Sequence, residues 1–257
     1  MPLNLVDGNN FARIQFEADP GGLPLRTLFI KAFHDPNPGV YVFDGHDSKA
    51  LRRALYPEYK MQRKRAPDNF YLMLGFYKEL LMHTKAVVVE VPGYEGDDVI
   101  ATLVKSHPDL DIIIESTDAD FCALTNQRVL LPKANLKTVG VEAKDVRLYK
   151  TLVKDVSDNI KGIKLFGDTA WNLLTEENKR YWRWVLEGRV LYTANYTLLG
   201  LTRELHCNWL AQNHKIIQAY WDIVGFYDVP AALISKHTTI GVPNYALAES
   251  KLSELMQ

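Results

Sequence analysis

Carboxylate side chains gather in one short part of the sequence. Glu95, Asp97 and Asp98 open a segment with helical spacing, and Asp118 and Asp120 follow the next apolar run. One or two acids in the first turn of a helix would be explained by favourable charge at that end. Helix-end charge does not explain three acids followed by two more beyond the next apolar run. Because oxygen-only ligands favour hard divalent cations such as Mg²⁺ or Mn²⁺, this stretch predicts a metal site.

The same pattern recurs where other apolar runs end. Asp7, Asp44 and Asp155 each follow such a run, and Asp158 comes shortly after the last of them. Singly, each acid would be explained as a turn or N-cap residue. In an α/β sheet, however, the loops at the carboxyl ends of the strands converge on one crevice, where so many carboxylates would repel one another without cations among them. Such a cluster could hold two metal ions about 4 Å apart and hydrolyse a phosphodiester. The predicted metal-binding acids are Asp7, Asp44, Glu95, Asp97, Asp98, Asp118, Asp120, Asp155 and Asp158.

A basic block complements these acids. Residues 49–65 hold seven lysines and arginines and one glutamate, so the net charge of −1 conceals two oppositely charged parts of the chain. Cations that meet phosphates are what a nucleic-acid channel requires. Lys60 and Arg63 follow Tyr59, an aromatic residue on which an exposed base could stack. The alternative is that this block is only a solvated helix face.

The pattern of apolar residues indicates the elements that must position these side chains. Strand-like runs alternate with helical spacing up to about residue 135, and mostly helical spacing follows, which predicts an α/β fold with a parallel sheet and a helical C-terminal subdomain. The chain of 257 residues, 47% hydrophobic and 24% charged, is typical of a globular protein with a substantial core. We expect no membrane span and no signal peptide. Cys122 and Cys207 are far apart in the sequence, which favours free thiols in a reducing compartment.

Six segments follow one another in a characteristic order between residue 3 and about residue 175. They are Leu5-Val-Asp7-Gly8, Arg52 with Tyr59-Lys-Met-Gln-Arg63, Pro67-Asp-Asn-Phe70, Tyr94-Glu-Gly-Asp-Asp98, Asp118-Ala-Asp120 and Asp155-Val-Ser-Asp158-Asn-Ile160. Each segment alone is weak evidence for any family, but together the six resemble the successive motifs of the 5′-nucleases. That family includes the 5′-3′ exonuclease domain of bacterial DNA polymerase I, free-standing bacteriophage exonucleases and flap endonucleases.

The resemblance implies a PIN-like α/β nuclease domain that uses divalent metals to cut single strands at 5′ ends or branched junctions. It places the nine acids on the family's metal-site acids, with Asp7 and Asp118 among the catalytic residues. It also places Lys60 on the lysine that reaches the scissile phosphate, and Arg63 on that lysine's companion arginine. The expected cofactor is Mg²⁺, for which Mn²⁺ could substitute, with two or more ions bound.

The resemblance further implies a division of the chain. Residues 1–150 would form the catalytic domain, in which residues 46–80 would be a helical arch around the 5′ strand. Residues 151–257 would form a helix-hairpin-helix-like DNA-binding and helical C-terminal region. The residues expected to bind nucleic acid are Arg52, Tyr59, Lys60, Arg63, Lys64, Lys161 and Lys164.

One turn departs from the family pattern. Where relatives usually have a glycine-rich hairpin, the segment Gly162–Gly167 has Leu165 in place of one glycine. Lys161 and Lys164 flank this turn and could meet phosphates directly.

Several functions stay open at this point. We expect a cytoplasmic monomer, in a bacterial or phage-infected cell, whose partners are DNA with 5′ ends or flaps, RNA–DNA hybrids and replication proteins. A ribonuclease of the same architecture and a structure-specific DNA-binding protein with vestigial acids are the alternatives. A phosphatase that uses a strand-end aspartate is disfavoured because Asn9 stands where a second aspartate would be expected. A dinucleotide-binding enzyme is disfavoured because no Gly-x-Gly-x-x-Gly follows the first strand.

Overall fold

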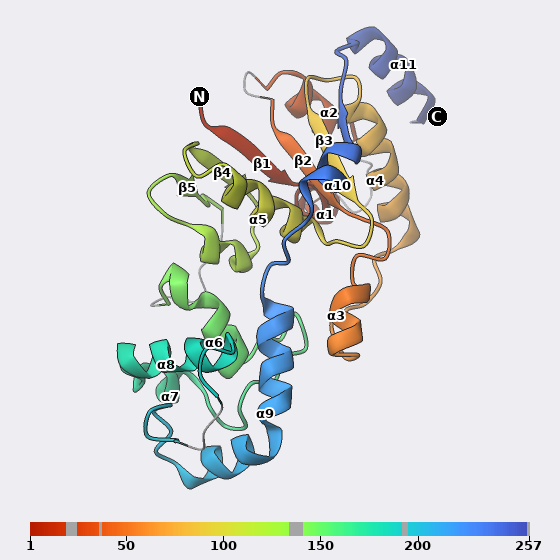
Figure 1. The fold of residues 1–257 in the computed structure, drawn as a ribbon. Helices are drawn as coiled ribbons and strands as arrows, with labels where there is room; N and C mark the ends of the chain where they lie inside the picture. The colour runs from red at the N-terminus through yellow and green to blue at the C-terminus, as the bar shows by residue number, and fades with distance from the viewer. Residues whose placement is uncertain (19–24, 36–37, 134–140, 192–194, 256–257) are drawn as a thin grey trace. The chain divides into compact units, whose positions relative to one another are not determined.

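The computed structural model describes residues 1–18, 25–35, 38–133, 141–191 and 195–255. The chain forms two compact units (Figure 1). Unit 1 comprises residues 1–49, 64–137 and 226–257, and unit 2 comprises residues 50–63 and 138–225. No helix in the described part of the chain is both long enough and apolar enough to span a bilayer.

Unit 1 is built on a six-stranded, mostly parallel sheet. Its strands are short runs of β-branched and aromatic residues, which suit a pleated, half-buried surface. The strands are β1 (Leu3–Asp7), β2 (Val40–Asp44), β3 (Val87–Val91), β4 (Ile112–Glu115), β5 (Val129–Leu130) and β6 (Thr238–Ile240). Their order is β5-β4-β1-β2-β3-β6, and every neighbouring pair is parallel except β3 and β6. The predicted parallel sheet is confirmed, whereas the antiparallel edge strand β6 was not predicted.

Helices cover both faces of this sheet because successive strand residues point to opposite faces. Val6 and Phe43 pack with one set of helices, and Leu5 and Val42 pack with the other. The first set is α1 (Gly8–Ala18), α2 (Leu25–Phe33), α4 (Asp68–Leu81) and α11 (Tyr245–Leu255). The second set is α5 (Gly96–Ser106), the 3₁₀ helix η1 (Ala119–Leu124) and α10 (Ala231–Lys236). Burial on both faces explains why the strands are apolar almost throughout.

Unit 2 is helical. Its elements are α3 (Ala50–Leu55), the 3₁₀ helix η2 (Ala143–Asp145), α6 (Val146–Leu152), α7 (Asp168–Asn172), α8 (Glu176–Leu186) and α9 (Glu204–Val224). Its core includes the buried rings of Tyr59, Trp182 and Tyr220. Helix α8 begins after Thr175, whose side-chain oxygen accepts a hydrogen bond from the backbone N of Asn178. Helix α9 is interrupted at Asn213, whose backbone is not helical.

The sequence prediction divides the chain once, at residue 150, whereas its contacts divide it differently. Segment 50–63 packs with residues 138–225, and the C-terminal segment returns to unit 1 through β6. The helical arch predicted for residues 46–80 corresponds to α3, a series of turns and α4. Its role as an arch stays a prediction.

Candidate metal centre and phosphate-binding residues

Four parallel strands of unit 1 end at the same edge of the sheet, within two residues of one another. Asp7 is the last residue of β1, and Asp44 is the last residue of β2. Asp44 lies opposite Val91, the last residue of β3, and Val6 lies opposite Glu115, the last residue of β4. The loops that follow β3 and β4 therefore begin at the same edge of the sheet as the two aspartates. These loops carry the other predicted acids of unit 1.

A chain of hydrogen bonds joins the ends of β1 and β4. The buried Ser116 hydroxyl donates to Asp7 Oδ2 at 2.9 Å and accepts from the backbone N of Asp118 at 3.0 Å. The side chain of Asn10 donates to Thr117 Oγ1 at 2.9 Å and accepts from Thr117 N at 3.1 Å. Residues that follow β1 and β4 thus hold in place Asp7 and Asp118, the two acids predicted to be catalytic.

The surroundings of the Asp7 carboxyl group disfavour its ionised form unless a cation lies nearby. Its side chain is buried, and burial raises its pKa to about 7, with further upward contributions from the charges of Asp44 and Asp118. Hydrogen bonds from Asn10 N and the Ser116 hydroxyl act in the opposite direction. A divalent cation beside Asp7 would favour the ionised form and lower this pKa. The burial of Asp7 therefore fits a cation-binding role.

Asp44 is held by contacts from the first turns of α1 and α5. Its backbone N donates to Asn9 Oδ1 at 2.9 Å, and its Oδ1 accepts from the backbone N of Gly96 at 2.8 Å. The next residue must be glycine, because a Cβ at Gly45 would lie 1.9 Å from the carbonyl oxygen of Val91. This close approach brings the turn after β2 against the end of β3.

The three acids at the start of α5 have different surroundings. Glu95 is the N-cap residue and is buried, and Asp97 in the first turn is half-buried. Asp98 is fully buried, and its two carboxylate oxygens accept from Glu95 N at 3.3 Å and from Tyr227 N at 2.8 Å. Each carboxylate oxygen has a second lone pair, so these hydrogen bonds leave room for a cation. That Asp98 binds the metal stays a prediction, and its observed contacts hold the backbone of Glu95 in place.

The acids after β4 form a compact turn. Asp118 is the N-cap residue of η1, and its Oδ1 accepts from the backbone N of Asp120 at 2.9 Å. Both acids are half-buried. Unit 1 therefore offers carboxylate oxygens, and neither thiolate nor imidazole, among the residues predicted to bind metal. This donor set fits a hard divalent cation.

The remaining two predicted acids lie in unit 2, on a tight loop between Asp155 and Ile160. The backbones of these two residues pair with each other through two hydrogen bonds of 2.9 and 2.7 Å. Asp155 Oδ1 accepts from Ser157 N at 2.8 Å, and Asp155 Oδ2 accepts from Lys150 Nζ at 2.8 Å. Burial acts to raise the pKa of Asp155, but the Lys150 ammonium and the Ser157 hydrogen bonds outweigh it and hold that pKa below its ordinary value.

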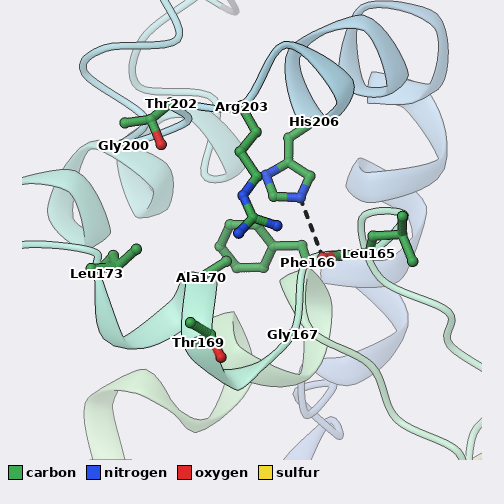
Figure 2. Close-up of a pocket in the computed structure, with 10 residues that line it drawn as sticks. All are labelled: Leu165, Phe166, Gly167, Thr169, Ala170, Leu173, Gly200, Thr202, Arg203 and His206. Carbon is green, nitrogen blue, oxygen red and sulfur yellow. Dashed lines mark hydrogen bonds between the residues drawn. The ribbon is translucent and has the colours of Figure 1, made fainter.

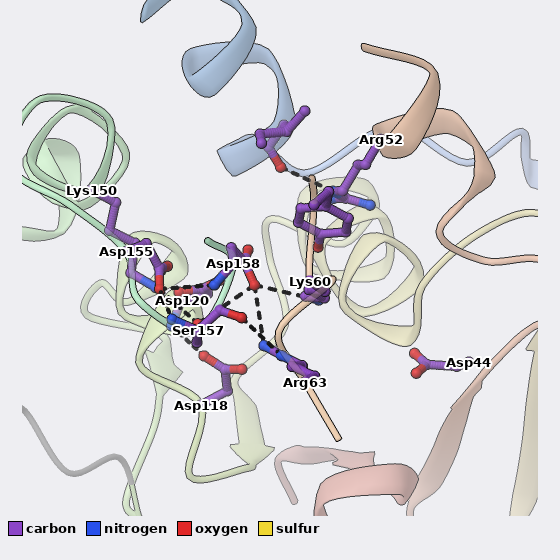
Figure 3. A network of polar contacts seen from close by, with 12 residues as sticks. Asp44, Arg52, Lys60, Arg63, Asp118, Asp120, Lys150, Asp155, Ser157 and Asp158 are labelled. Carbon is purple, nitrogen blue, oxygen red and sulfur yellow. Dashed lines mark hydrogen bonds and ion pairs between the residues drawn. The ribbon is translucent and has the colours of Figure 1, made fainter. Parts of the chain in front are cut away.

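Two predicted phosphate-binding residues converge on the second acid of this loop (Figure 3). Lys60 Nζ lies 3.7 Å from Asp158 Oδ1, and Arg63 Nη2 lies 3.1 Å from the same oxygen. Arg63 also donates to the carbonyl oxygen of Ser157 at 2.9 Å. The backbone of Lys60 has a φ of +53°, a conformation that is strained for a lysine and often marks functional positions.

The other predicted nucleic-acid contacts are exposed lysines. Lys161 forms an ion pair with Glu58 at 3.2 Å, in unit 2. Lys164 has no ion-pair or hydrogen-bond partner among the described residues, and the same is true of Lys64 in unit 1. Lys64 and Lys164 are therefore the cations of this set that are most available to a phosphate.

Comparisons with known proteins agree with this geometry. A family model described as the 5′-3′ exonuclease N-terminal resolvase-like domain matches residues 2–154. A 5′-3′ exonuclease of Aquifex aeolicus is 34% identical over 198 residues, which cover 67% of this chain and 68% of that protein. The chain belongs to the 5′-3′ exonuclease family. A DNA polymerase I of Caldicellulosiruptor bescii is 32% identical over 208 residues, and the match covers 69% of this chain but only 24% of that polymerase.

Solved structures with similar folds come from bacteriophage T5. A T5 5′-exonuclease with bound zinc aligns with a TM-score of 0.58 at 18% identity, covering 91% of this chain and 96% of that one. A T5 flap endonuclease in complex with DNA and metal ions aligns with a TM-score of 0.57 at 16% identity, covering 99% of both chains. At these identities the likeness supports the fold of this family member.

Two residues of this exonuclease-family chain differ from their predicted roles. Tyr59 is 1% exposed, so its ring offers no face to an exposed base and instead belongs to the core of unit 2. Arg52 is also buried, and it donates to the carbonyl oxygens of Ile223 at 2.9 Å and Gly225 at 3.1 Å. Both predictions of nucleic-acid contact are therefore corrected. Arg52 satisfies carbonyl groups near the end of α9, a structural role.

Sequence reasoning missed the residues that hold the acids in place. Ser116, Asn10 and Lys150 each contact a predicted acid or its loop, although they come from different segments. Ser157, two residues after Asp155, could have been predicted as part of an aspartate turn. Lys150 gives no signal in a single sequence, because nothing in its spacing distinguishes it from an exposed lysine.

Proposed function

We propose that this chain is a divalent-metal-dependent 5′ nuclease that hydrolyses phosphodiester bonds at 5′ ends, flaps or junctions of DNA. Family membership gives the class of reaction, and the proposal concerns this chain alone rather than the much longer polymerases that it partly matches. The observation that carries the proposal is the alignment of carboxylates at the ends of parallel strands in unit 1.

The metal-binding residues that we propose in unit 1 are Asp7, Asp44, Glu95, Asp97, Asp98, Asp118 and Asp120. The cation that we propose is Mg²⁺, in two or more copies. Bound there, such ions would activate water and stabilise the leaving oxygen of the phosphodiester. That Asp155 and Asp158 of unit 2 belong to the same metal-binding set stays a prediction from the family resemblance.

The residues of the chain itself would perform the positioning. Ser116 and Asn10 hold Asp7 and the Asp118 turn in fixed orientations, so little reorganisation is needed when a cation binds. The raised pKa of Asp7 means that cation binding must displace a proton at neutral pH.

For the phosphate, we propose Lys60 and Arg63 as the positively charged residues that stabilise the developing charge. Both side chains are restrained by Asp158, and the Lys60 side chain is almost fully buried. A buried, preorganised cation stabilises a transition state more than a freely moving one in water. The ion pairs therefore support a catalytic role for Lys60 rather than a solvated one.

The test is a panel of end-labelled substrates with Mg²⁺: a 5′ flap, a nicked duplex, a single strand and an RNA–DNA hybrid. We expect short products released from the 5′ side of the flap or nick, and no cleavage when EDTA replaces Mg²⁺. Cleavage confined to the RNA strand of the hybrid would instead support a ribonuclease. Binding of the flap without cleavage of any substrate would support a DNA-binding protein with inactive acids.

A further inference from the structure

The chain returns from unit 2 to unit 1 directly after α9. This helix begins beside a cavity of unit 2 (Figure 2) and ends at Val224, and unit 1 resumes at Phe226. Residues 226–230 form neither helix nor strand. The exposed Asp228 of this segment forms an ion pair of 2.7 Å with Lys105, in the last turn of α5. The returning segment therefore lies against α5, the helix that begins with proposed metal-binding acids.

Two backbone amides of the segment donate to side chains on one face of α5. Tyr227 N donates to Asp98 Oδ1 at 2.8 Å, and Val229 N donates to Thr102 Oγ1 at 3.0 Å. Asp98 and Thr102 are four positions apart, which places them on the same side of the helix. Both side chains are buried, as is Val229. These hydrogen bonds therefore satisfy polar groups that are withdrawn from water.

The first residue of the segment packs against η1. The rings of Phe226 and Phe121 are stacked, with centroids 5.9 Å apart and an angle of 11° between their planes. Phe121 is completely buried and directly follows Asp120. Stacked aromatic pairs are favourable beyond the area that they bury. The same short segment thus contacts both α5 and η1.

These two elements carry most of the acids that we propose to bind metal. With their N-cap residues, they supply Glu95, Asp97, Asp98, Asp118 and Asp120. Asp98 has no exposed surface, so its charge must be balanced by donors and cations. The Tyr227 amide reaches this carboxylate from outside α5 and fixes one of its oxygens, which leaves the second lone pair of that oxygen in a defined direction.

We propose that residues 226–229 are a positioning segment for the metal centre, in which the Tyr227 amide orients the Asp98 carboxylate and the Phe226 ring holds the start of η1. The inference rests on the proposed function, because that function supplies the metal ions. Removing a group that orients a metal ligand commonly weakens metal binding by about ten- to a hundredfold. The family model matches residues 2–154, so the family match does not assign this segment.

The first test measures Mn²⁺ binding to the full chain without DNA, from the electron paramagnetic resonance signal of the free ion. Tyr227→Pro removes the donating N–H and should weaken Mn²⁺ binding by about tenfold or more. Thr102→Val is the matched control, because it removes the acceptor of the Val229 amide without changing an acid. That variant should melt at a lower temperature and keep its Mn²⁺ affinity. Unchanged affinity in Tyr227→Pro, or an equal loss in both variants, would overturn the proposal.

A double-mutant cycle separates the orientation of Asp98 from a general loosening of the site. Asp98→Ala should itself weaken Mn²⁺ binding. Tyr227→Pro should then add little further loss, because the amide no longer has a carboxylate to orient. An equal loss from Tyr227→Pro in both backgrounds would show that the amide does not act through Asp98.

The third test does not depend on the folding of the proline variant. Phe226→Ala removes the ring that stacks on Phe121, whereas Phe226→Tyr keeps a ring there. The Mn²⁺ affinity should fall several-fold in the first variant and be kept in the second. Equal affinities for these two variants would remove Phe226 from the proposal.

Hydrogen exchange of the wild-type protein tests the amide without any substitution. The Tyr227 amide should exchange more slowly with Mg²⁺ than in EDTA, because bound cations hold the acids and their donors together. Exchange at the same rate in both conditions would contradict the role of this amide.

Cleavage of a 5′ flap, measured on the same proteins, separates this inference from the proposed function. If the wild type binds Mn²⁺ but cleaves nothing, and Tyr227→Pro binds Mn²⁺ more weakly, only the nuclease proposal is lost. If the wild type cleaves and Tyr227→Pro binds Mn²⁺ as tightly as the wild type, only this inference is lost. A wild-type protein that binds no Mn²⁺ would overturn both.

Discussion

Replacing Asp7 by asparagine should stabilise the metal-free protein while removing a group needed for activity. Asp7 is buried at the end of β1, and its pKa is raised from 3.8 to about 7 by burial and by the charges of Asp44 and Asp118. Its ionised form is therefore unfavourable in the fold. An asparagine keeps an oxygen that can accept from Asn10 N and has no charge to desolvate.

The size of the effect follows from the pKa. A rise from 3.8 to about 7 corresponds to about 4 kcal/mol of lost stability once Asp7 is fully ionised, as an upper value. Because the pKa in the folded state is higher than in the unfolded state, this loss of stability is absent below about pH 4, grows as the pH rises from about 4 to about 7, and is complete above about pH 7. Asparagine places an NH2 group where Asp7 Oδ2 accepts from the Ser116 hydroxyl, and the loss of this hydrogen bond offsets part of the effect. We therefore expect a net gain of about 2 kcal/mol at pH 8, or roughly 4 to 8 °C in melting temperature.

The assay is thermal unfolding in EDTA at pH 5 and pH 8, followed by circular dichroism. Asp7→Asn should melt above the wild type at pH 8, and the difference should shrink at pH 5. The exposed Asp109 provides the control, since Asp109→Asn should change the melting temperature little at either pH. An Asp7→Asn protein that melts at or below the wild type at pH 8 would refute the reasoning.

Three further predictions concern lysines. Lys60→Ala should slow single-turnover cleavage by roughly a hundredfold or more, because a preorganised charge is removed. The affinity for a long duplex should change little. A loss in affinity alone would show that Lys60 only binds a phosphate and does not contribute to catalysis. Lys150→Met should lower the stability of the protein by about 3 kcal/mol in urea unfolding at pH 7, because the buried Asp155 loses its ion-pair partner, and an unchanged midpoint would contradict this. Lys164→Ala should reduce the slope of log affinity against log salt for duplex binding by about one. Lys161→Ala should reduce that slope less, because Lys161 already forms an ion pair with Glu58. Equal slopes for the two variants would show that this ion pair does not affect duplex binding.

The spacing of apolar residues along the chain predicted the strands and helices that this spacing alone determines. The parallel strands of unit 1 were predicted because each is a short apolar run between helical segments, which is a local feature. Strand β6 was missed, since Thr238–Ile240 is a strand only through its pairing with β3, about 150 residues earlier. Helix α2 (Leu25–Phe33) was also missed, and its buried face is explained by packing against distant segments.

In the candidate site, too, contacts between residues distant in sequence were not predicted. The acids at strand ends were predicted because the position of an acid after an apolar run is a local feature. The hydrogen bond from Tyr227 N to Asp98 was not predicted, since the two residues are distant in sequence. Tyr59 and Arg52 were assigned to the surface because they lie in a basic block, whereas their surroundings in the core come from α9 and other helices of unit 2.

The central claim is that carboxylates at the strand ends bind the cations needed for cleavage, and Asp118→Asn tests it most directly. Asparagine can still cap η1 through its side-chain oxygen, so the fold should survive while a ligand charge is lost. The measurement is single-turnover cleavage of a 5′-labelled flap with Mg²⁺, together with affinity for the same flap in EDTA. We predict that cleavage falls below detection while affinity is kept or increased, because a negative charge near the phosphate is removed. Cleavage by Asp118→Asn at the wild-type rate would contradict the account.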